Sequence, residues 1–363
     1  MKILVRILAI LHGLVCIPLL AAYLARYIDP LKIKWLVVAT YAFPWLLLLN
    51  ALFIPLWLIF KRKMLWFAVP LLLLGTPMIN GLIPLRNYFS ATPSGEGHLK
   101  IMTYNVHVFG LYNWRQKDIT KNEMFRYIET EDPDIACFQE YFYDSGGFFP
   151  TTDSLLKILK AKYYYQVFSA HSAKTQKFGI ATFSKYPIIA KGSIRFEKTH
   201  NLCIYTDILY EKDTLRVYNC HLQSLYFNDK NYRELENFDS SDIPKGNVGQ
   251  YRNIVGKILL AAQRRSSQVK ILRQHIDSCQ YSIIVCGDFN DNPFSYAYRI
   301  VSKGFKDSFS GAGSGFGYTW EQKGVKQRID YVLYSKDLVC SEHKITRVPY
   351  SDHYPLVVKI GKK

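Results

Sequence analysis

The sequence predicts an α+β sandwich that follows a membrane anchor of three transmembrane helices. Three observations predict it: long apolar runs fill the first 90 residues, strand-like and helix-like segments then alternate, and polar side chains recur where the strands end. Alternating strands and helices are typical of a sheet core covered by helices. We therefore expect a membrane anchor at 1–90, a linker at 91–97 and a second domain at 98–363.

Three apolar runs at 4–25, 35–60 and 64–85 each supply the ~20 residues that a helix needs to cross ~30 Å of hydrocarbon. A core helix of a soluble protein carries polar residues along one face, and these runs carry almost none. His12 and Asn50 are expected to join neighbouring helices by hydrogen bonds. The first run resembles a signal peptide, but its length and the two further runs favour a retained anchor. The sequence therefore predicts an integral, multi-pass membrane protein.

Basic residues set the expected orientation of the anchor. Lys61, Arg62 and Lys63 form the densest cluster, between the second and third runs, and such clusters stay in the cytoplasm. Three spans then place the second domain outside the cytoplasm, in the periplasm of a two-membrane bacterium, with the inner membrane as its location. The linker reaches only ~24 Å when extended, so the domain lies close to the bilayer. The unpaired cysteines would be safer in a reducing cytoplasm, which leaves that alternative open.

The charge balance suits an anionic partner. The first 97 residues hold nine Lys or Arg and two acidic residues, which leaves 37 basic and 27 acidic residues, a net +10, for the second domain. Nucleic acid or a phospholipid surface would match this surplus, although a charged surface is usually only a solvated one. The cysteines indicate neither a disulfide framework nor a zinc site, because Cys137, Cys220 and Cys286 lie in apolar stretches and no CxxC spacing occurs.

Strands and helices are expected in a definite order along the second domain. Short β-branched and aromatic runs predict strands near 100–106, 135–139, 163–169, 178–184, 203–210, 215–221, 282–287, 328–334 and 355–360. Apolar residues at helical spacing predict helices at 120–131, 152–162 and 254–276. A hairpin turn is expected at Glu211–Thr214, and a capping box formed by Thr120 and Glu123 is expected at the first helix.

Polar residues stand at the ends of these strands. In VCGDFNDNP, residues 285–293, an apolar strand runs directly into two acidic and two amide side chains. A polar turn would explain this segment alone, since Asn, Asp and Pro are ordinary turn residues. The other strand ends repeat the pattern, and the full set is Asn105, Glu140, His221, Asp288, Asn290, Asp330, Asp352 and His353.

Together these residues match the requirements of phosphoester hydrolysis. That reaction needs a hard cation, an activated water molecule and stabilisation of charge on the phosphoryl oxygens. Glu140, Asp288 and Asp352 offer the oxygen ligands that Mg²⁺ prefers, and a His–Asp pair supplies an oriented proton-transfer group. Taken singly, Asn105 would fit a turn and His221 a buried structural histidine. The prediction therefore depends on the whole set.

The motifs resemble those of the endonuclease/exonuclease/phosphatase superfamily. MTYNV, CFQE, FGIATFSKYPI, CHLQS, GDFND, RIDYVLYS and SDHYPL occur in the expected order over nearly all of 98–363. Members of this superfamily include deoxyribonuclease I, apurinic endonucleases, inositol-phosphate phosphatases and neutral sphingomyelinases. The resemblance implies a deoxyribonuclease I-like fold, a two-sheet β-sandwich flanked by helices, in a membrane-anchored bacterial branch.

The resemblance also implies a metal and a phosphate site. Glu140 is expected to be the principal ligand of Mg²⁺ or Mn²⁺, with Asn105 and Asp352 close to the metal. Asn105, Asn290 and His221 are expected to contact the substrate phosphate.

Five residues are expected to carry the chemistry. Asp288 would orient or deprotonate the attacking water, and Asn290 would position that water and the phosphate. His221 and His353 would donate hydrogen bonds to the phosphate, and one of them would serve as general acid or base. Asp330 would orient His353.

Three functions remain open at this point. The first is a metal-dependent phosphodiesterase that acts on nucleic acid or another soluble phosphoester. The second is a lipid-directed phosphodiesterase of sphingomyelinase or phosphoinositide type, which the short tether favours. The third is a non-catalytic, anchored binding module, which is disfavoured because every motif position is filled. The polar stretch 222–253 is either a solvent-exposed insertion or a substrate-selecting loop. No protein partner is evident.

Overall fold

The computed structural model describes residues 2–84, 98–111, 117–147, 149–172, 175–225 and 248–363. The expected linker at 91–97 and most of the polar stretch 222–253 lie outside the described residues. The chain divides into two compact units. The larger unit holds Ile83–Ser224, Gln268–Asn290 and Val301–Lys363, and the smaller holds Met1–Leu82, Leu225–Ser267 and Asp291–Ile300.

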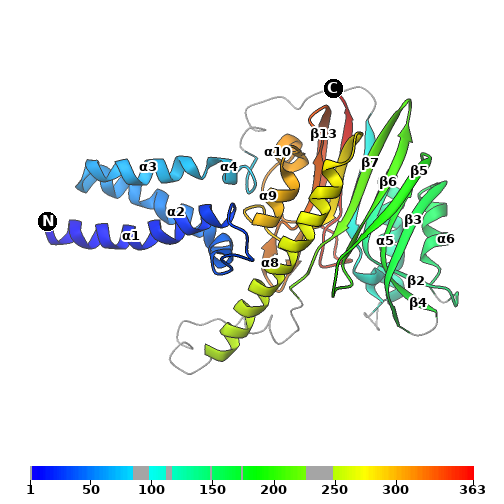
Figure 1. The fold of residues 1–363 in the computed structure, drawn as a ribbon, viewed down its shortest axis with the longest axis horizontal. Coiled ribbons are helices and arrows are strands. Elements are labelled where there is room, and N and C mark those ends of the chain that lie inside the picture. The colour runs from blue at the N-terminus through cyan, green and yellow to red at the C-terminus, as the bar shows by residue number, and fades with distance from the viewer. Residues whose placement is uncertain (1, 85–97, 112–116, 148, 173–174, 226–247) are drawn as a thin grey trace. The chain divides into compact units, whose positions relative to one another are not determined.

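Two six-stranded sheets form the larger unit (Figure 1). The first sheet has the order β13-β14-β1-β2-β4-β3, from β1 (Leu99–Asn105), β2 (Ile135–Asp144), β3 (Tyr163–Ser172), β4 (Gln176–Ser184), β13 (Leu338–Ile345) and β14 (Leu356–Lys362). The second has the order β5-β6-β7-β8-β12-β9, from β5 (Ile188–Arg195), β6 (Leu202–Tyr210), β7 (Asp213–His221), β8 (Ser282–Asp288), β9 (Lys306–Asp307) and β12 (Asp330–Tyr334). A separate hairpin pairs β10 (Trp320–Gln322) with β11 (Val325–Gln327).

Alternating side chains make the first sheet apolar on both faces. Ile101 and Ile135 pack with Val217 of the second sheet, inside the sandwich. Their sequence neighbours Met102 and Ala136 belong to a different cluster, which includes helical residues. Successive side chains of a strand point to opposite faces, so such a sheet needs a covering layer on each side. The two-sheet α+β architecture with flanking helices is therefore confirmed.

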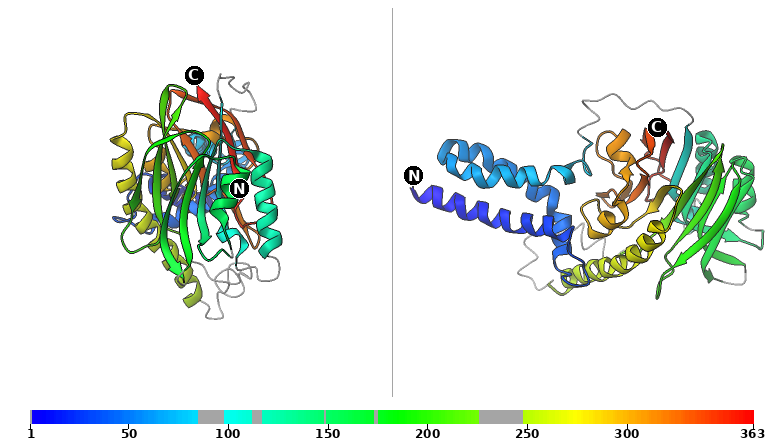
Figure 2. Two further views of the ribbon diagram at one scale, coloured as in Figure 1. Left: turned by 90° about the vertical axis from the view of Figure 1, so that its right-hand side faces the viewer. Right: turned by 45° about the horizontal axis from the view of Figure 1, so that its top comes forward.

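Helices cover the outer faces of the sandwich (Figure 2, left). On the first sheet lie α5 (Lys117–Glu131) and α6 (Thr151–Ile158), which bury Met124, Ile128 and Leu155. On the second sheet, Tyr218 of β7 bonds His275 of α8 (Val248–Asp277) at 2.8 Å. The larger unit also contains the short helices η3 (His107–Gly110) and α10 (Ser308–Ala312), whereas α9 (Tyr296–Ser302) begins in the smaller unit.

Two helices complete parallel crossovers that bring strand ends together. Helix α5 joins β1 to β2, α8 joins β7 to β8, and both strand pairs are parallel. Parallel strands need such a crossover, and their carboxyl ends then meet at one edge of the sheet. All three predicted helices have counterparts, although α5 begins at Lys117. Thr120 therefore lies inside the helix, and the predicted capping box is wrong.

Strand prediction succeeded in the core and at the edge strand β3, and missed the other sheet edges. The predicted hairpin is confirmed, because Tyr210 pairs with Asp213 and Glu211 adopts a φ of 54° in the turn. The sequence missed the edge strands β5, β9 and β13 and the short hairpin of β10 and β11. In β5 and β13, exposed or half-buried polar residues weaken the apolar signal. All seven cysteines are free thiols, as predicted.

The smaller unit contains the apolar N-terminal helices. They are α1 (Lys2–Ala25), α2 (Leu36–Phe60), η1 (Arg62–Met64), α3 (Leu65–Leu74) and α4 (Thr76–Ile79). In the described residues, two of them, α1 and α2, are long and apolar enough to cross a membrane. The third predicted span is divided at Gly75, where Pro77 follows in the first turn of α4 and supplies no backbone N–H. The prediction of three helices of membrane length is therefore wrong.

A buried polar network nevertheless joins α1, α2 and α3. Asn50 accepts a hydrogen bond from His12 Nε2 at 3.0 Å and donates to the Ala68 carbonyl at 3.0 Å. Trp57 donates to the other ring nitrogen of His12 at 3.1 Å. Each ring nitrogen of His12 thus has a partner, which agrees with the predicted role of His12 and Asn50 as contacts between helices.

Candidate active site

The register of the second sheet places three predicted residues side by side. His221 ends β7 and pairs with Asp288, which ends β8. Asp330 begins β12 and pairs with Asp288 from the other side. Asp288 is 1% exposed, so its carboxylate lies at the buried centre of this row.

Asn105 connects this row to the first sheet. Its side-chain amide donates to Glu140 Oε1 and to Asp288 Oδ2, both at 3.1 Å. Its oxygen accepts the backbone N–H of His107 at 3.1 Å. Asn105 is fully buried, and its hydrogen bonds bring together one carboxylate from each sheet. The expected metal ligand Glu140 and the expected water-orienting residue Asp288 therefore share one neighbour.

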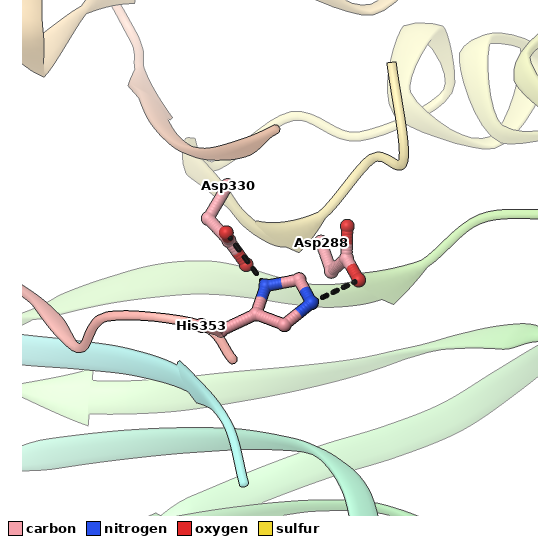
Figure 3. A group of neighbouring side chains, drawn as sticks. All are labelled: Asp288, Asp330 and His353. Atoms are coloured by element: carbon pink, nitrogen blue, oxygen red, sulfur yellow. Dashed lines mark hydrogen bonds and ion pairs between the residues drawn. The ribbon is translucent and has the colours of Figure 1, made fainter. Parts of the chain in front are cut away.

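His353 lies between two carboxylates (Figure 3). Its Nδ1 bonds Asp330 Oδ2 at 2.9 Å, and its Nε2 lies 3.7 Å from Asp288 Oδ2. Burial alone would lower the pKa of His353, but the charges of Asp330 and Asp288 raise it well above its ordinary value. Burial is also the main cause that raises the pKa of Asp288, to about 6, against the charge of His353. The imidazole is thus held in one orientation by both neighbours.

His221 presents a ring nitrogen to the same two carboxylates. Its Nε2 lies 3.7 Å from Asp288 Oδ2 and 3.9 Å from Glu140 Oε1, both beyond hydrogen-bond distance. Within the described part of the chain this buried nitrogen has no hydrogen-bond partner. A buried polar atom of this kind bonds a group from outside the protein, which is a water molecule, an ion or a substrate atom.

Two site residues adopt strained backbone conformations. Glu140 has a φ of 49° and Asn290 a φ of 52°, although neither is glycine. A β-bulge between Phe138 and Tyr141 accompanies the first and redirects the Glu140 side chain. Asn290 is held by its own amide, which donates to the Leu222 carbonyl at 2.9 Å. Strain of this kind costs about 1–3 kcal/mol and is typical of functional sites.

Asp352 is bound by two residues that the sequence did not single out for the site. His107 Nδ1 lies 3.2 Å from its Oδ1, and Trp320 Nε1 donates to its Oδ2 at 3.1 Å. Burial alone would raise the pKa of Asp352, but the hydrogen bond with His107 and the charge of His353 hold it below its ordinary value. No hydrogen bond links Asp352 to Glu140 in the described residues. Asp352 is connected to the centre through Ser351, whose hydroxyl donates to the Asn105 carbonyl at 2.9 Å.

A buried amide pair lies directly behind the site. Gln139 donates to Asn219 Oδ1 at 2.6 Å and to Thr103 Oγ1 at 3.0 Å, and Asn219 donates to the Ala181 carbonyl at 2.9 Å. Gln139 precedes Glu140, and Asn219 lies two residues before His221. The pair joins the two sheets where they carry site residues. In the sequence, this pair could have been noticed only because Gln139 in CFQE and Asn219 in VYNCHL are amide residues inside otherwise apolar strands.

The donor atoms fit a hard divalent cation at Glu140. Its side chain is 36% exposed, so its carboxylate can reach a bound cation, whereas Asn105 turns its amide nitrogen toward Glu140 and its amide oxygen toward the His107 N–H. Carboxylate oxygens are ligands that Mg²⁺ prefers. Asp288, Asp330 and His353 also offer ligand atoms within 4.8 Å of one another. These three residues already hold each other, which suits proton transfer better than metal binding.

Comparison with known proteins decides the family. The sequence profile of the Endonuclease/Exonuclease/phosphatase family matches residues 102–353, a range that contains every residue of the site. The chain belongs to this family. It is therefore a hydrolytic enzyme of the nuclease and phosphatase type. A second profile, described as Domain of unknown function (DUF8431), matches residues 5–82. No curated protein matches the chain.

Solved structures of family members share the fold. An endonuclease/exonuclease/phosphatase family protein from Leptotrichia buccalis is 20% identical, with a TM-score of 0.52 over 72% of this chain and 99% of its own. The endonuclease/exonuclease/phosphatase from Bacteroides vulgatus is 14% identical, with a TM-score of 0.53 over 74% and 100%. The human Nocturnin catalytic domain, with a bound sulfate anion, is 18% identical, with a TM-score of 0.50 over 73% and 94%. These likenesses bear on the fold alone.

Proposed function

We propose that this family member is a membrane-anchored, divalent-metal-dependent phosphodiesterase of the nuclease type, in which water attacks phosphorus. The observation that carries the proposal is the Asn105 bridge, which joins Glu140 to Asp288. It places a carboxylate suited to a metal beside a buried carboxylate suited to orienting water. The unpartnered nitrogen of His221 faces both, where a phosphate oxygen would accept its hydrogen bond.

Glu140, with Asn105 and Asp352 near it, would hold Mg²⁺ or Mn²⁺. A bound divalent cation polarises the phosphoryl oxygen and neutralises the charge that develops on it. Carboxylate and amide donors favour hard cations over metals that prefer thiolates. Of the two carboxylates, that of Glu140 is the more exposed, at 36% against 23% for the Asp352 side chain, which supports its role as principal ligand.

The protein's own residues would position and activate the water. Asp288 is buried at the centre of the row and would orient the water and accept its proton. Asn290, whose amide also donates to Asp288 Oδ2 at 3.1 Å, would hold the water and the phosphate in place. His353, oriented by Asp330, would donate to the phosphate or to the leaving group.

The proposed substrate class is inferred from the net charge of the protein and from its apolar N-terminal helices. The net charge of +10 on the second domain favours a polyanion, so nucleic acid or another soluble phosphoester is the first proposal. A lipid-directed phosphodiesterase is the alternative, because the helices of the smaller unit expose large apolar side chains. Trp45 is 70% exposed, Trp66 81% and Ile59 74%, as expected for helices in contact with lipid. Family membership removes the third possibility, a non-catalytic binding module.

Contacts inside the smaller unit support the proposed orientation. Arg299 lies over the Tyr27 ring at 4.5 Å, and Ser266 donates to Asp29 at 2.6 Å. Tyr27 and Asp29 lie between α1 and α2, whereas Lys61–Lys63 lie at the other end of α2. With the basic cluster in the cytoplasm, residues 266 and 299 lie on the opposite side of the membrane. We therefore place the catalytic residues in the periplasm, with the inner membrane as the anchor.

One set of assays tests the proposal. The detergent-purified chain should hydrolyse bis-p-nitrophenyl phosphate with Mg²⁺ or Mn²⁺, and EDTA should abolish the activity. Turnover that survives exhaustive chelation would contradict the metal requirement. Plasmid DNA and phospholipid vesicles then compete as substrates, and preferential hydrolysis of the vesicles would favour the lipid-directed alternative. Alkaline phosphatase fused after Lys363 reports the side of the membrane, because this reporter is active only outside the cytoplasm.

A further inference from the structure

Residues 291–300 directly follow the GDFN strand end and pack with the N-terminal helices. Asp288 and Asn290 belong to the larger unit, but from Asp291 onward this segment belongs to the smaller unit, with α1 to α4 and the first part of α8. The chain therefore passes from one unit to the other immediately after Asn290.

A buried ion pair anchors the start of this segment. Arg265 Nε of α8 donates to Asp291 Oδ2 at 2.9 Å, and the two residues are 0% and 3% exposed. The Tyr41 hydroxyl of α2 interacts with the same Arg265 guanidinium. Burying two charges is unfavourable unless their geometry is well satisfied, so such pairs select one arrangement more than they add stability. The cluster therefore specifies how Asp291 packs against α2 and α8.

Two further contacts hold the next residues against α2. Asn292 donates to Thr40 Oγ1 at 3.3 Å. The Phe294 ring lies 4.6 Å from Phe43, and both rings are buried in the apolar cluster of the N-terminal helices. Residues of α2 thus contact three of the four residues that follow Asn290, directly or through Arg265.

These contacts lie next to Asn290, a proposed catalytic residue with a strained backbone conformation. Asn290 has a φ of 52°, a conformation that persists only where the surrounding structure imposes it. On its N-terminal side, β8 and the hydrogen bond from Asn290 N to Asp288 Oδ1 at 2.8 Å hold the chain. On its C-terminal side, the chain continues directly into Asp291, Asn292 and Phe294, which are packed in the smaller unit.

We propose that Asp291, Asn292 and Phe294 are positioning residues that fix Asn290 through the backbone, and that α2 completes this clamp through Thr40, Tyr41 and Phe43. The N-terminal helices are then part of the catalytic apparatus as well as its anchor. The inference rests on the role proposed for Asn290 in holding water and phosphate.

The first test measures turnover in the full chain in detergent. A double variant, Thr40→Val with Tyr41→Phe, removes two polar contacts at nearly constant volume. It should lower kcat about tenfold or more with KM changed less than about twofold, since a misplacement near 1 Å can reduce rates about 100-fold. Thr76→Val is the matched control, because Thr76 bonds only the Leu73 carbonyl of its own helix region among the described residues. An unchanged kcat in the double variant would overturn the proposal.

The second test needs no activity, so it remains decisive if the proposed function is wrong or the variant does not fold. A protease recognition sequence replaces residues 91–97, and the full chain is cleaved there in detergent. The clamp predicts that the N-terminal fragment stays bound to the remainder through size-exclusion chromatography. It also predicts that Phe43→Ala with Phe294→Ala releases that fragment. Separation of the unsubstituted fragments after cleavage would overturn the proposal.

Discussion

Asp330 Oδ2 lies 2.9 Å from His353 Nδ1, and the opposite ring nitrogen lies 3.7 Å from Asp288. The two aspartates are paired across β8 and β12, so the sheet register sets the spacing into which the imidazole fits. His353 reaches this position from the segment before β14, in the other sheet. The orientation of the imidazole therefore depends on both sheets.

This relationship predicts a ranking of two variants. His353→Ala removes the donor and should lower kcat by about 10²–10⁴-fold. Asp330→Asn should lower kcat less, because the imidazole is misoriented but still present. Steady-state hydrolysis of bis-p-nitrophenyl phosphate measures both, with His200→Ala as a control at an exposed histidine. The reverse ranking would mean that Asp330 contacts the substrate or the metal directly.

Glu140→Gln should raise the Mg²⁺ concentration needed for half-maximal activity. The substitution keeps the shape of the side chain but replaces a charged ligand with a neutral one, which binds a hard cation more weakly. Titration of activity against Mg²⁺ measures the shift. Glu129→Gln, at an exposed position of α5, is the matched control. An unchanged titration would assign the metal to another carboxylate.

Gln139→Leu should destabilise the larger unit by about 1–3 kcal/mol, because buried acceptors on Asn219 and Thr103 lose their donor. Combining it with Asn219→Leu should cost less than the sum of the two single changes, since Gln139 and Asn219 then no longer leave each other without a partner. Thermal unfolding in detergent compares the three variants, with Gln322→Leu on β10 as a control. Strict additivity would show that the amide pair is not coupled.

His343 should make the larger unit sensitive to acid. Burial lowers the pKa of His343 to about 3, against the opposing charge of Asp307, and only its Nδ1 has a partner, Ser308 Oγ at 2.9 Å, in the described residues. A histidine in an unfolded chain has a pKa of about 6.5. Below that pH the unfolded chain takes up a proton that the folded chain refuses, so stability falls by up to about 1.4 kcal/mol per pH unit.

His343→Gln removes this titration and keeps a hydrogen-bonding side chain. The unfolding midpoint of the variant should fall less steeply than that of the unsubstituted chain between about pH 6.5 and 5. Thermal unfolding across that range measures the two slopes. Parallel slopes would show that His343 does not titrate differently in the folded and unfolded chains.

The local pattern of apolar and polar residues was sufficient to predict the core strands but not to predict where the third apolar helix is interrupted. The strands β1, β7 and β8 are apolar runs that end in polar residues, so composition alone marks where they stop. The run at 64–85 is also apolar, but hydropathy does not register the interruption at Gly75 and Pro77. Edge strands such as β5 carry too few buried residues to be distinguished from loops.

By itself the sequence determined which chemistry is present and at which strand ends it stands, because Asp288, Asn290, Asp330 and His353 each lie at or next to the end of a strand that local pattern predicts. The tertiary structure alone decided which of these groups touch. Asn105 bonds Asp288, 183 residues further along the chain, and Gln139 bonds Asn219, 80 residues further along. Helix and strand periodicity relate only residues that are close in sequence, so neither pair can be predicted from it. Such contacts depend on strand register and on the stacking of two sheets. Both are set by the packing of the whole domain, so the clamp on Asn290 and the unpartnered nitrogen of His221 could be found only there.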